Sequence, residues 1–241
     1  MKRASSALAV IWTVATLCPR AGAAAQQQVN FKTDDGVSIT ATLYAPSRPA
    51  PAVILLHPLT RSREDWRTVG ARLADAGVVA LALDLRGHGA SDPPPAGSGG
   101  RELAGMSLDI KAARAFLAGR REVLQGRVGL LGASVGANLA VLAAADDPSV
   151  RTLALLSPGL DYRGLRTEAA LNRYGGRPAL LVGSLEDNYV MISMRRLAGQ
   201  GAGRGTREQV VLDGAGHGTV MVGRHPELIE LLVDWFRRTL L

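Results

Sequence analysis

The sequence predicts an α/β fold with a mainly parallel sheet that helices cover on both faces. Short apolar runs rich in Val, Leu and Ala alternate with segments of helical spacing along most of the chain, as repeated strand–helix–strand units require. These runs are continuous, which is typical of strands buried on both faces. With 241 residues, 47% of them hydrophobic, the chain is long enough to form one large core.

The predicted elements follow in chain order. Asp34-Asp35-Gly36 separates the first two strands, and Asp-Gly is a strong turn signal for a hairpin. Gly77 ends the first helix, and the Pro- and Gly-rich residues 92–100 are predicted to form a loop. The predicted strands are 29–33, 38–44, 52–56, 78–85, 127–132, 152–156, 179–182 and 209–212. The predicted helices are 66–76, 108–124, 135–145, 190–198 and 226–238.

The first 25 residues have the organisation of a secretory signal peptide. Lys2 and Arg3 precede an apolar run over residues 7–17, which is too short to span a bilayer. Small residues then lead up to Ala25, as at a cleavage site. An uncleaved membrane anchor is the alternative. We expect a signal peptide over 1–25, one domain over 26–241, export to the periplasm or the medium, and no stable membrane association after cleavage.

Charge and cysteine content exclude several classes of protein. The formal net charge is +7, but three of the 28 basic residues lie in the leader, which leaves 25 against 21 acidic residues. The remaining arginines are scattered and are not interleaved with aromatic residues, so we expect no nucleic-acid partner. Cys18 is the only cysteine, which rules out an intrachain disulfide and a zinc ribbon.

Gly132-Ala133-Ser134-Val135-Gly136 is the strongest chemical signal. This G-x-S-x-G pattern lies directly between a predicted strand and a predicted helix, where a sharp turn exposes the serine hydroxyl at the edge of a sheet. The alternative interpretation is a turn of small residues that only packs a helix against a strand.

With this motif the chain resembles the α/β-hydrolase family over essentially its whole length after the leader. The resemblance rests on the G-x-S-x-G motif and on three further loops. Within the family, the chain is most similar to small, lidless, esterase-like members close to the dienelactone hydrolases. It implies an α/β-hydrolase fold with an eight-stranded, mainly parallel sheet and no large lid. The three loops are Leu55-Leu56-His57-Pro58-Leu59, Asp84-Leu85-Arg86-Gly87-His88-Gly89-Ala90-Ser91 and Gly214-Ala215-Gly216-His217-Gly218.

A serine hydroxyl needs a base, and the base needs a carboxylate to orient it. His217, in a glycine-rich loop after the last predicted strand, is the candidate base for Ser134. The resemblance assigns the acid to Asp187, and the chain order Ser134, Asp187, His217 is that of the family. Glu186 and Asp161 are the two rival carboxylates.

Two backbone N–H groups are expected to form an oxyanion hole. Val135, directly after Ser134, supplies one, and Leu59 matches the second donor of the family; Pro58 has no N–H to donate. The remaining histidines receive other roles: His57 and His88 are structural or line the site, and His225 lies at a helix start.

These residues indicate a serine hydrolase that cleaves small carboxylic esters through an acyl-enzyme, with no metal and no organic cofactor. Only about twenty residues separate Ser157 from Arg177, which leaves no room for a large lid and favours an open site. Leu59, Leu160, Tyr162 and Tyr189 are weaker candidates to line it. A peptidase, a thioesterase or a perhydrolase would use the same triad, and a non-catalytic binding protein is the remaining alternative. The oligomeric state is left open.

Overall fold

The chain folds into an eight-stranded sheet in the order β1-β2-β4-β3-β5-β6-β9-β10. The computed structural model describes residues 25–97, 102–199 and 207–241. β1 pairs antiparallel with β2, β2 pairs antiparallel with β4, and all other neighbours are parallel. The predicted α/β class and the mainly parallel eight-stranded sheet are therefore confirmed. The strands are β1 (Ala25–Lys32), β2 (Ser38–Ala45), β3 (Ala50–Leu56), β4 (Val79–Leu83), β5 (Val123–Ala133), β6 (Val150–Leu156), β9 (Ala179–Ser184) and β10 (Arg207–Leu212).

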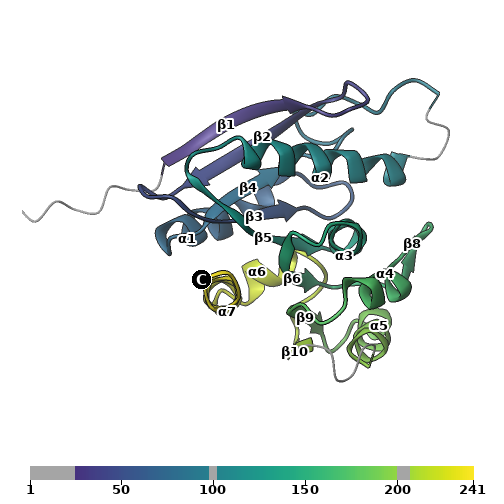
Figure 1. The fold of residues 1–241 in the computed structure, drawn as a ribbon. Helices are drawn as coiled ribbons and strands as arrows, with labels where there is room; N and C mark the ends of the chain where they lie inside the picture. The colour runs from purple at the N-terminus through teal and green to yellow at the C-terminus, as the bar shows by residue number, and fades with distance from the viewer. Residues whose placement is uncertain (1–24, 98–101, 200–206) are drawn as a thin grey trace, which may run out of the picture.

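Helices cover both faces of this sheet (Figure 1). Because successive side chains of a strand point to opposite faces, the core divides into two clusters of buried residues. In one, α2, α3, α4 and α5 pack on the sheet; in the other, α1, α6 and α7 do. The helices are α1 (Arg67–Asp75), α2 (Glu102–Ala118), α3 (Val135–Asp146), α4 (Thr167–Tyr174), α5 (Asn188–Ala198), α6 (Val220–Arg224) and α7 (Glu227–Leu240).

The predicted helix over 108–124 is wrong at both ends. α2 begins at Glu102 and ends at Ala118, and the chain turns before β5 begins at Val123. Val123 is buried because it pairs with Ala50 at the start of β3, whereas Leu124 is exposed. The apolar spacing near the end of the segment thus reflects a strand paired with a distant one, which local periodicity does not reveal.

Five short elements were not predicted from the sequence. A 3-10 turn (Arg63–Trp66) precedes α1, and α6 lies between the last strand and α7. Between β6 and β9 the chain forms a two-residue-strand hairpin, β7 (Asp161–Tyr162) and β8 (Leu165–Arg166), followed by α4. α4 packs against α3 and α5, so this connection belongs to the body of the fold and is not a large lid.

The predicted signal peptide lies outside the described residues except for Ala25, which is the first residue of β1. Within the described ranges, none of the helices combines the length and the apolar character needed to cross a bilayer.

Candidate active site

Ser134 forms a sharp turn between β5 and α3. Its φ is 54° and its ψ is −118°, a region that non-glycine residues adopt only at a cost of about 1–3 kcal/mol. Its own N–H donates to the Leu156 carbonyl of the neighbouring strand at 2.8 Å, and its carbonyl accepts from the Ala137 N–H at 2.9 Å. The backbone is therefore held on the sheet side and on the helix side.

Both glycines of the motif are required by close backbone approach. A Cβ atom on Gly132 would collide with the Gly136 carbonyl, and a Cβ atom on Gly136 would collide with the Leu56 carbonyl at the end of β3. The first turn of α3 therefore lies directly against the sheet edge. The small-residue packing suggested as an alternative is present, and it is what allows the Ser134 turn to form.

The structure brings Ser134, His217 and Asp187 together at the carboxyl edge of the sheet. His217 Nε2 lies 2.9 Å from Ser134 Oγ, and His217 Nδ1 lies 2.6 Å from Asp187 Oδ2. Since a carboxylate can only accept, Nδ1 carries the proton and Nε2 is free to accept from the Ser134 hydroxyl. Ser134 follows β5, Asp187 follows β9 and His217 follows β10. These three strands lie on one side of the sheet centre.

The two rival carboxylates are placed elsewhere. Asp187 caps α5, because its Oδ1 accepts from the Val190 N–H at 3.1 Å while its Oδ2 faces the imidazole. Asp161 accepts from the Gly164 N–H and the Arg166 guanidinium in the β7–β8 hairpin. Glu186 accepts from backbone N–H groups of the loop that carries His217. Asp187 is thus the carboxylate that contacts the ring.

The two expected oxyanion donors lie just beyond the ends of two adjacent parallel strands. Leu59 follows β3 and Val135 follows β5, and these strands pair with Leu56 opposite Gly132. The Val135 N–H is at the start of α3, where N–H groups have no partner within the helix. Leu59 is half-buried and packs against the core. Its donor role remains a prediction.

Two histidines hold the loop that carries Leu59. His57 is fully buried; its Nε2 accepts from the Leu85 N–H at 3.0 Å and its Nδ1 donates to the Pro58 carbonyl at 2.6 Å. His88 Nε2 accepts from the Thr60 N–H at 3.2 Å. Both rings therefore work as neutral acceptors of backbone N–H groups. Burial is the main reason why the pKa of His57 is lowered to about 4.

Asp84 joins the same loop to the one that follows β4. Its side chain is fully buried and accepts from the Arg63 N–H at 2.7 Å and from the Ala90 N–H at 2.8 Å. It also pairs with the Arg63 guanidinium. A buried carboxylate is stable only when it is paired and hydrogen-bonded in this way. The Asp84–Ser91 motif thus has a structural role next to the site.

Three polar residues near the site were not singled out from the sequence. Ser157 directly follows β6, and Ser184 is the last residue of β9. Thr219 lies two residues after His217. Thr219 donates its hydroxyl to Asp65 at 2.5 Å. For Ser157 and Ser184, the only signal available in the sequence was their position at the ends of strands that share one sheet edge.

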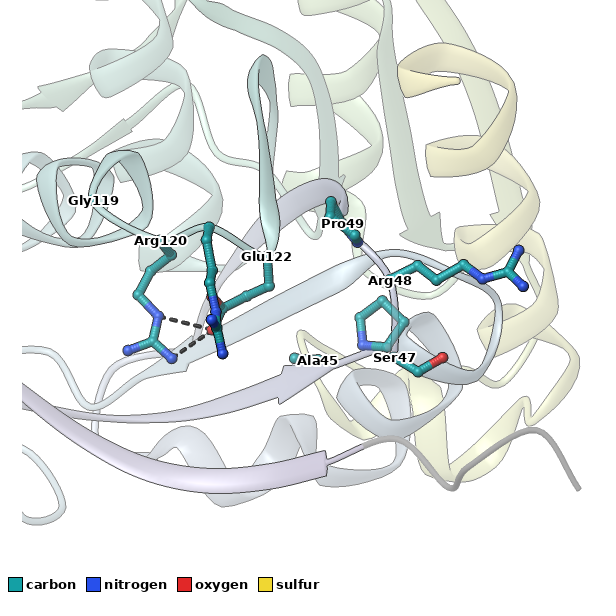
Figure 2. Close-up of a pocket in the computed structure, with 9 residues that line it drawn as sticks. Ala45, Ser47, Arg48, Pro49, Gly119, Arg120 and Glu122 are labelled. Carbon is teal, nitrogen blue, oxygen red and sulfur yellow. Dashed lines mark hydrogen bonds and ion pairs between the residues drawn. The ribbon is translucent and has the colours of Figure 1, made fainter. Parts of the chain in front are cut away.

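A cavity of about 690 Å³ lies at the opposite edge of the sheet (Figure 2). It is lined by the β2–β3 turn and by the segment before β5, where Arg120 pairs with Glu122. This cavity is separate from the triad.

Among the residues that the structure describes, no group of three or more His, Cys, Asp or Glu side chains is arranged to hold a metal ion.

A model of the family Hydrolase_4, described as serine aminopeptidase, S33, matches residues 47–174, which is more than half of the chain. The chain belongs to this family of α/β-hydrolases. The match runs from the β2–β3 turn to the end of α4 and includes Ser134.

Known relatives match this chain to different extents. Thiohydrolase apmlB of Arthrinium phaeospermum is 30% identical over 136 residues, which are 55% of this chain and 43% of the relative. The chain thus spans less than half the length of that relative. Pyrococcus furiosus esterase Pf2001 superposes with a TM-score of 0.74 at 21% identity, covering 90% of this chain and 93% of the esterase. A dienelactone hydrolase from Anabaena variabilis superposes with a TM-score of 0.73 at 20% identity, covering 91% of this chain and all of the other.

We predict that Gly136→Ala destabilises the protein by about 1–3 kcal/mol, because the new methyl group must push α3 away from the Leu56 carbonyl. Gly223→Ala in α6 is the matched control, since nothing lies within 4 Å of a Cβ atom there. The control is expected to be neutral or slightly stabilising. Urea unfolding of both variants measures the difference, and equal stabilities would contradict the close approach of α3.

We also predict that His57 makes the fold less stable in acid. The unfolded histidine titrates near 6.5 and the folded one at about 4. The unfolded chain therefore binds the additional proton between these values, and stability is lost as the pH falls from about 6.5 towards 4. The loss attributable to His57 between pH 7.5 and 4.5 is about 2–3 kcal/mol.

His57→Gln keeps an acceptor for the Leu85 N–H and cannot titrate, so its unfolding free energy should vary less over this range than that of the wild type. His225→Gln is the control with the opposite effect. The hydrogen bond with Glu227 raises the pKa of His225, so removing this histidine should make the unfolding free energy fall more, not less, as the pH decreases. Urea unfolding at several pH values tests both. A wild-type pH dependence in His57→Gln would show that His57 is not kept neutral.

Proposed function

We propose that this protein is a serine hydrolase that cleaves carboxylic esters. The observation that carries the proposal is the unbroken chain of contacts from Ser134 Oγ to His217 Nε2 and from His217 Nδ1 to Asp187 Oδ2. A hydroxyl, a base and an orienting carboxylate in this order form the arrangement that activates a serine nucleophile. The half-exposed imidazole, with 52% of its side chain accessible, leaves the site open to a substrate.

In the first half of the proposed reaction, Ser134 Oγ forms a bond to the ester carbonyl carbon while its proton moves to His217 Nε2. Asp187 stabilises the imidazolium and holds its Nδ1 proton. The negative charge on the carbonyl oxygen is stabilised by the N–H groups of Val135 and Leu59. The carbon–oxygen bond then breaks, and the leaving alcohol takes the proton from His217.

The second half uses water in place of the alcohol. His217 accepts a proton from a water molecule, whose oxygen bonds to the acyl carbon, and the same N–H groups stabilise the second oxyanion. Ser134 Oγ leaves with the proton from His217, and the carboxylic acid is released. Every proton passes through Nε2, so this reaction depends on keeping Nδ1 bonded to Asp187.

A thioester is the second substrate class. The relative that is 30% identical over part of the chain is named a thiohydrolase, and thioester cleavage needs the same nucleophile and base. The family description names an aminopeptidase, which makes peptides a third class. An expected leader over residues 1–25 would place the ester hydrolase outside the cytoplasm, and we propose export on that basis alone.

We predict that Ser134→Ala lowers kcat on short p-nitrophenyl esters by at least about 10³-fold, because the nucleophile is lost. Asp187→Asn should lower kcat by about 10³–10⁴-fold, because the wrong imidazole tautomer is stabilised. Ser107→Ala, on the exposed face of α2, is the matched control and should keep wild-type activity.

A fluorophosphonate probe should label the wild type and not Ser134→Ala. A folded wild type that resists the probe and leaves esters, thioesters and aminoacyl nitroanilides intact would favour a non-catalytic binding protein. The ratio of kcat/KM among these three substrates then identifies the bond that is cleaved.

A further inference from the structure

The loop that carries His217 has an alternating backbone. Gly214, Gly216 and Gly218 have φ values of 64°, 79° and 63°, in the left-handed region that favours glycine. When left-handed residues alternate with others, successive N–H groups turn towards one side and form a concave site for an anion. A loop built in this way needs an acceptor, because its N–H groups have no partners in a helix or a strand.

Side chains from two neighbouring strand ends supply the acceptors. The Glu186 carboxylate accepts from the Gly214 N–H at 3.2 Å and from the Gly216 N–H at 3.1 Å. Ser184 Oγ accepts from Ala215 and Gly216 at 2.9 and 3.0 Å. On the other side, Ser157 Oγ accepts from the Gly218 N–H at 2.9 Å.

Glu186 is the only carboxylate among the described residues that accepts from the Gly214 and Gly216 N–H groups. The hydrogen bond with Ser184 and the backbone N–H groups together lower the pKa of Glu186 to about 2. Its side chain is therefore an anion throughout the neutral and mildly acidic range. The next residue, Asp187, contacts the ring of His217.

We propose that Glu186 is a positioning residue: its carboxylate fills the concave site formed by the Gly214 and Gly216 N–H groups and keeps His217 within reach of Ser134. The role rests on the proposed function. Two consecutive carboxylates thus have different roles: Glu186 orients the backbone of the loop that carries His217, and Asp187 orients the imidazole.

This role predicts a specific kinetic signature. Without the carboxylate, the Gly214 N–H turns to water and the Gly216 N–H keeps only Ser184 Oγ as an acceptor. The loop then spends less time with His217 Nε2 next to Ser134 Oγ. Glu186 contacts the loop and not the nucleophile, so substrate binding should be unaffected. Glu186→Gln should therefore lower kcat by about tenfold or more, with KM within twofold of the wild type.

Two further variants separate reach from charge. Glu186→Asp keeps the negative charge but is one methylene shorter, so it should lose kcat to a similar extent. Asp213→Asn removes a charge from the same loop and leaves the Glu186 contacts in place, so kcat should stay within twofold. If Glu186 acted only through its charge, both charge-removing variants, Glu186→Gln and Asp213→Asn, would lower kcat, and Glu186→Asp would leave kcat unchanged.

The pH profile of kcat/KM and amide hydrogen exchange complete the test. Glu186→Gln should lower the plateau of the profile and speed exchange at Gly214 and Gly216, with no change at amides of the β-sheet. An unchanged plateau, or unchanged exchange at both glycines, overturns the proposal. The exchange measurement needs no turnover, so it remains decisive if the wild type cleaves no ester, a result that would count against the proposed function alone.

Discussion

The chain has to pass from the end of β5 into α3 within a single residue, Ser134, and the rest of the site depends on this turn. The backbone can make it only with a positive φ and with α3 lying directly against the sheet edge. Gly132 and Gly136 remove the Cβ atoms that would prevent that approach. A strained residue of this kind persists only where its surroundings over-determine it. Here hydrogen bonds from β6 and from α3 do so.

The remaining groups reach Ser134 because parallel strands end at one edge of the sheet. Ligand and catalytic groups gather at such carboxyl edges in open α/β sheets. The loops at this edge run over the end of the core and lack the ladder bonds of the strands. Buried polar side chains supply the missing partners: His57 and Asp84 for the loop after β3, and Ser157 and Ser184 for the loop of His217.

Much of the fold could be predicted from the sequence, because continuous apolar runs are a local property. The hairpin, the buried strands and the helix after Ser134 all have a local signal. α2 shows where local reasoning fails: the apolar spacing towards Leu124 is helical, yet Val123 pairs with Ala50, some seventy residues away in the chain. Such a pairing stabilises a strand through contacts that the segment itself does not contain.

For the site, the sequence by itself determined which residue types were available and in which loops they lie. Ser134 was singled out by its motif, His217 by its glycine-rich loop after the last strand, and Asp187 by the resemblance to the family, with Glu186 and Asp161 as rivals. Only the tertiary structure decided between Asp187 and its neighbour Glu186, because adjacent side chains in a loop can face opposite ways. One contacts the imidazole and the other contacts the backbone N–H groups. The direction of a side chain follows from the folded backbone around it, and no spacing in the sequence encodes it.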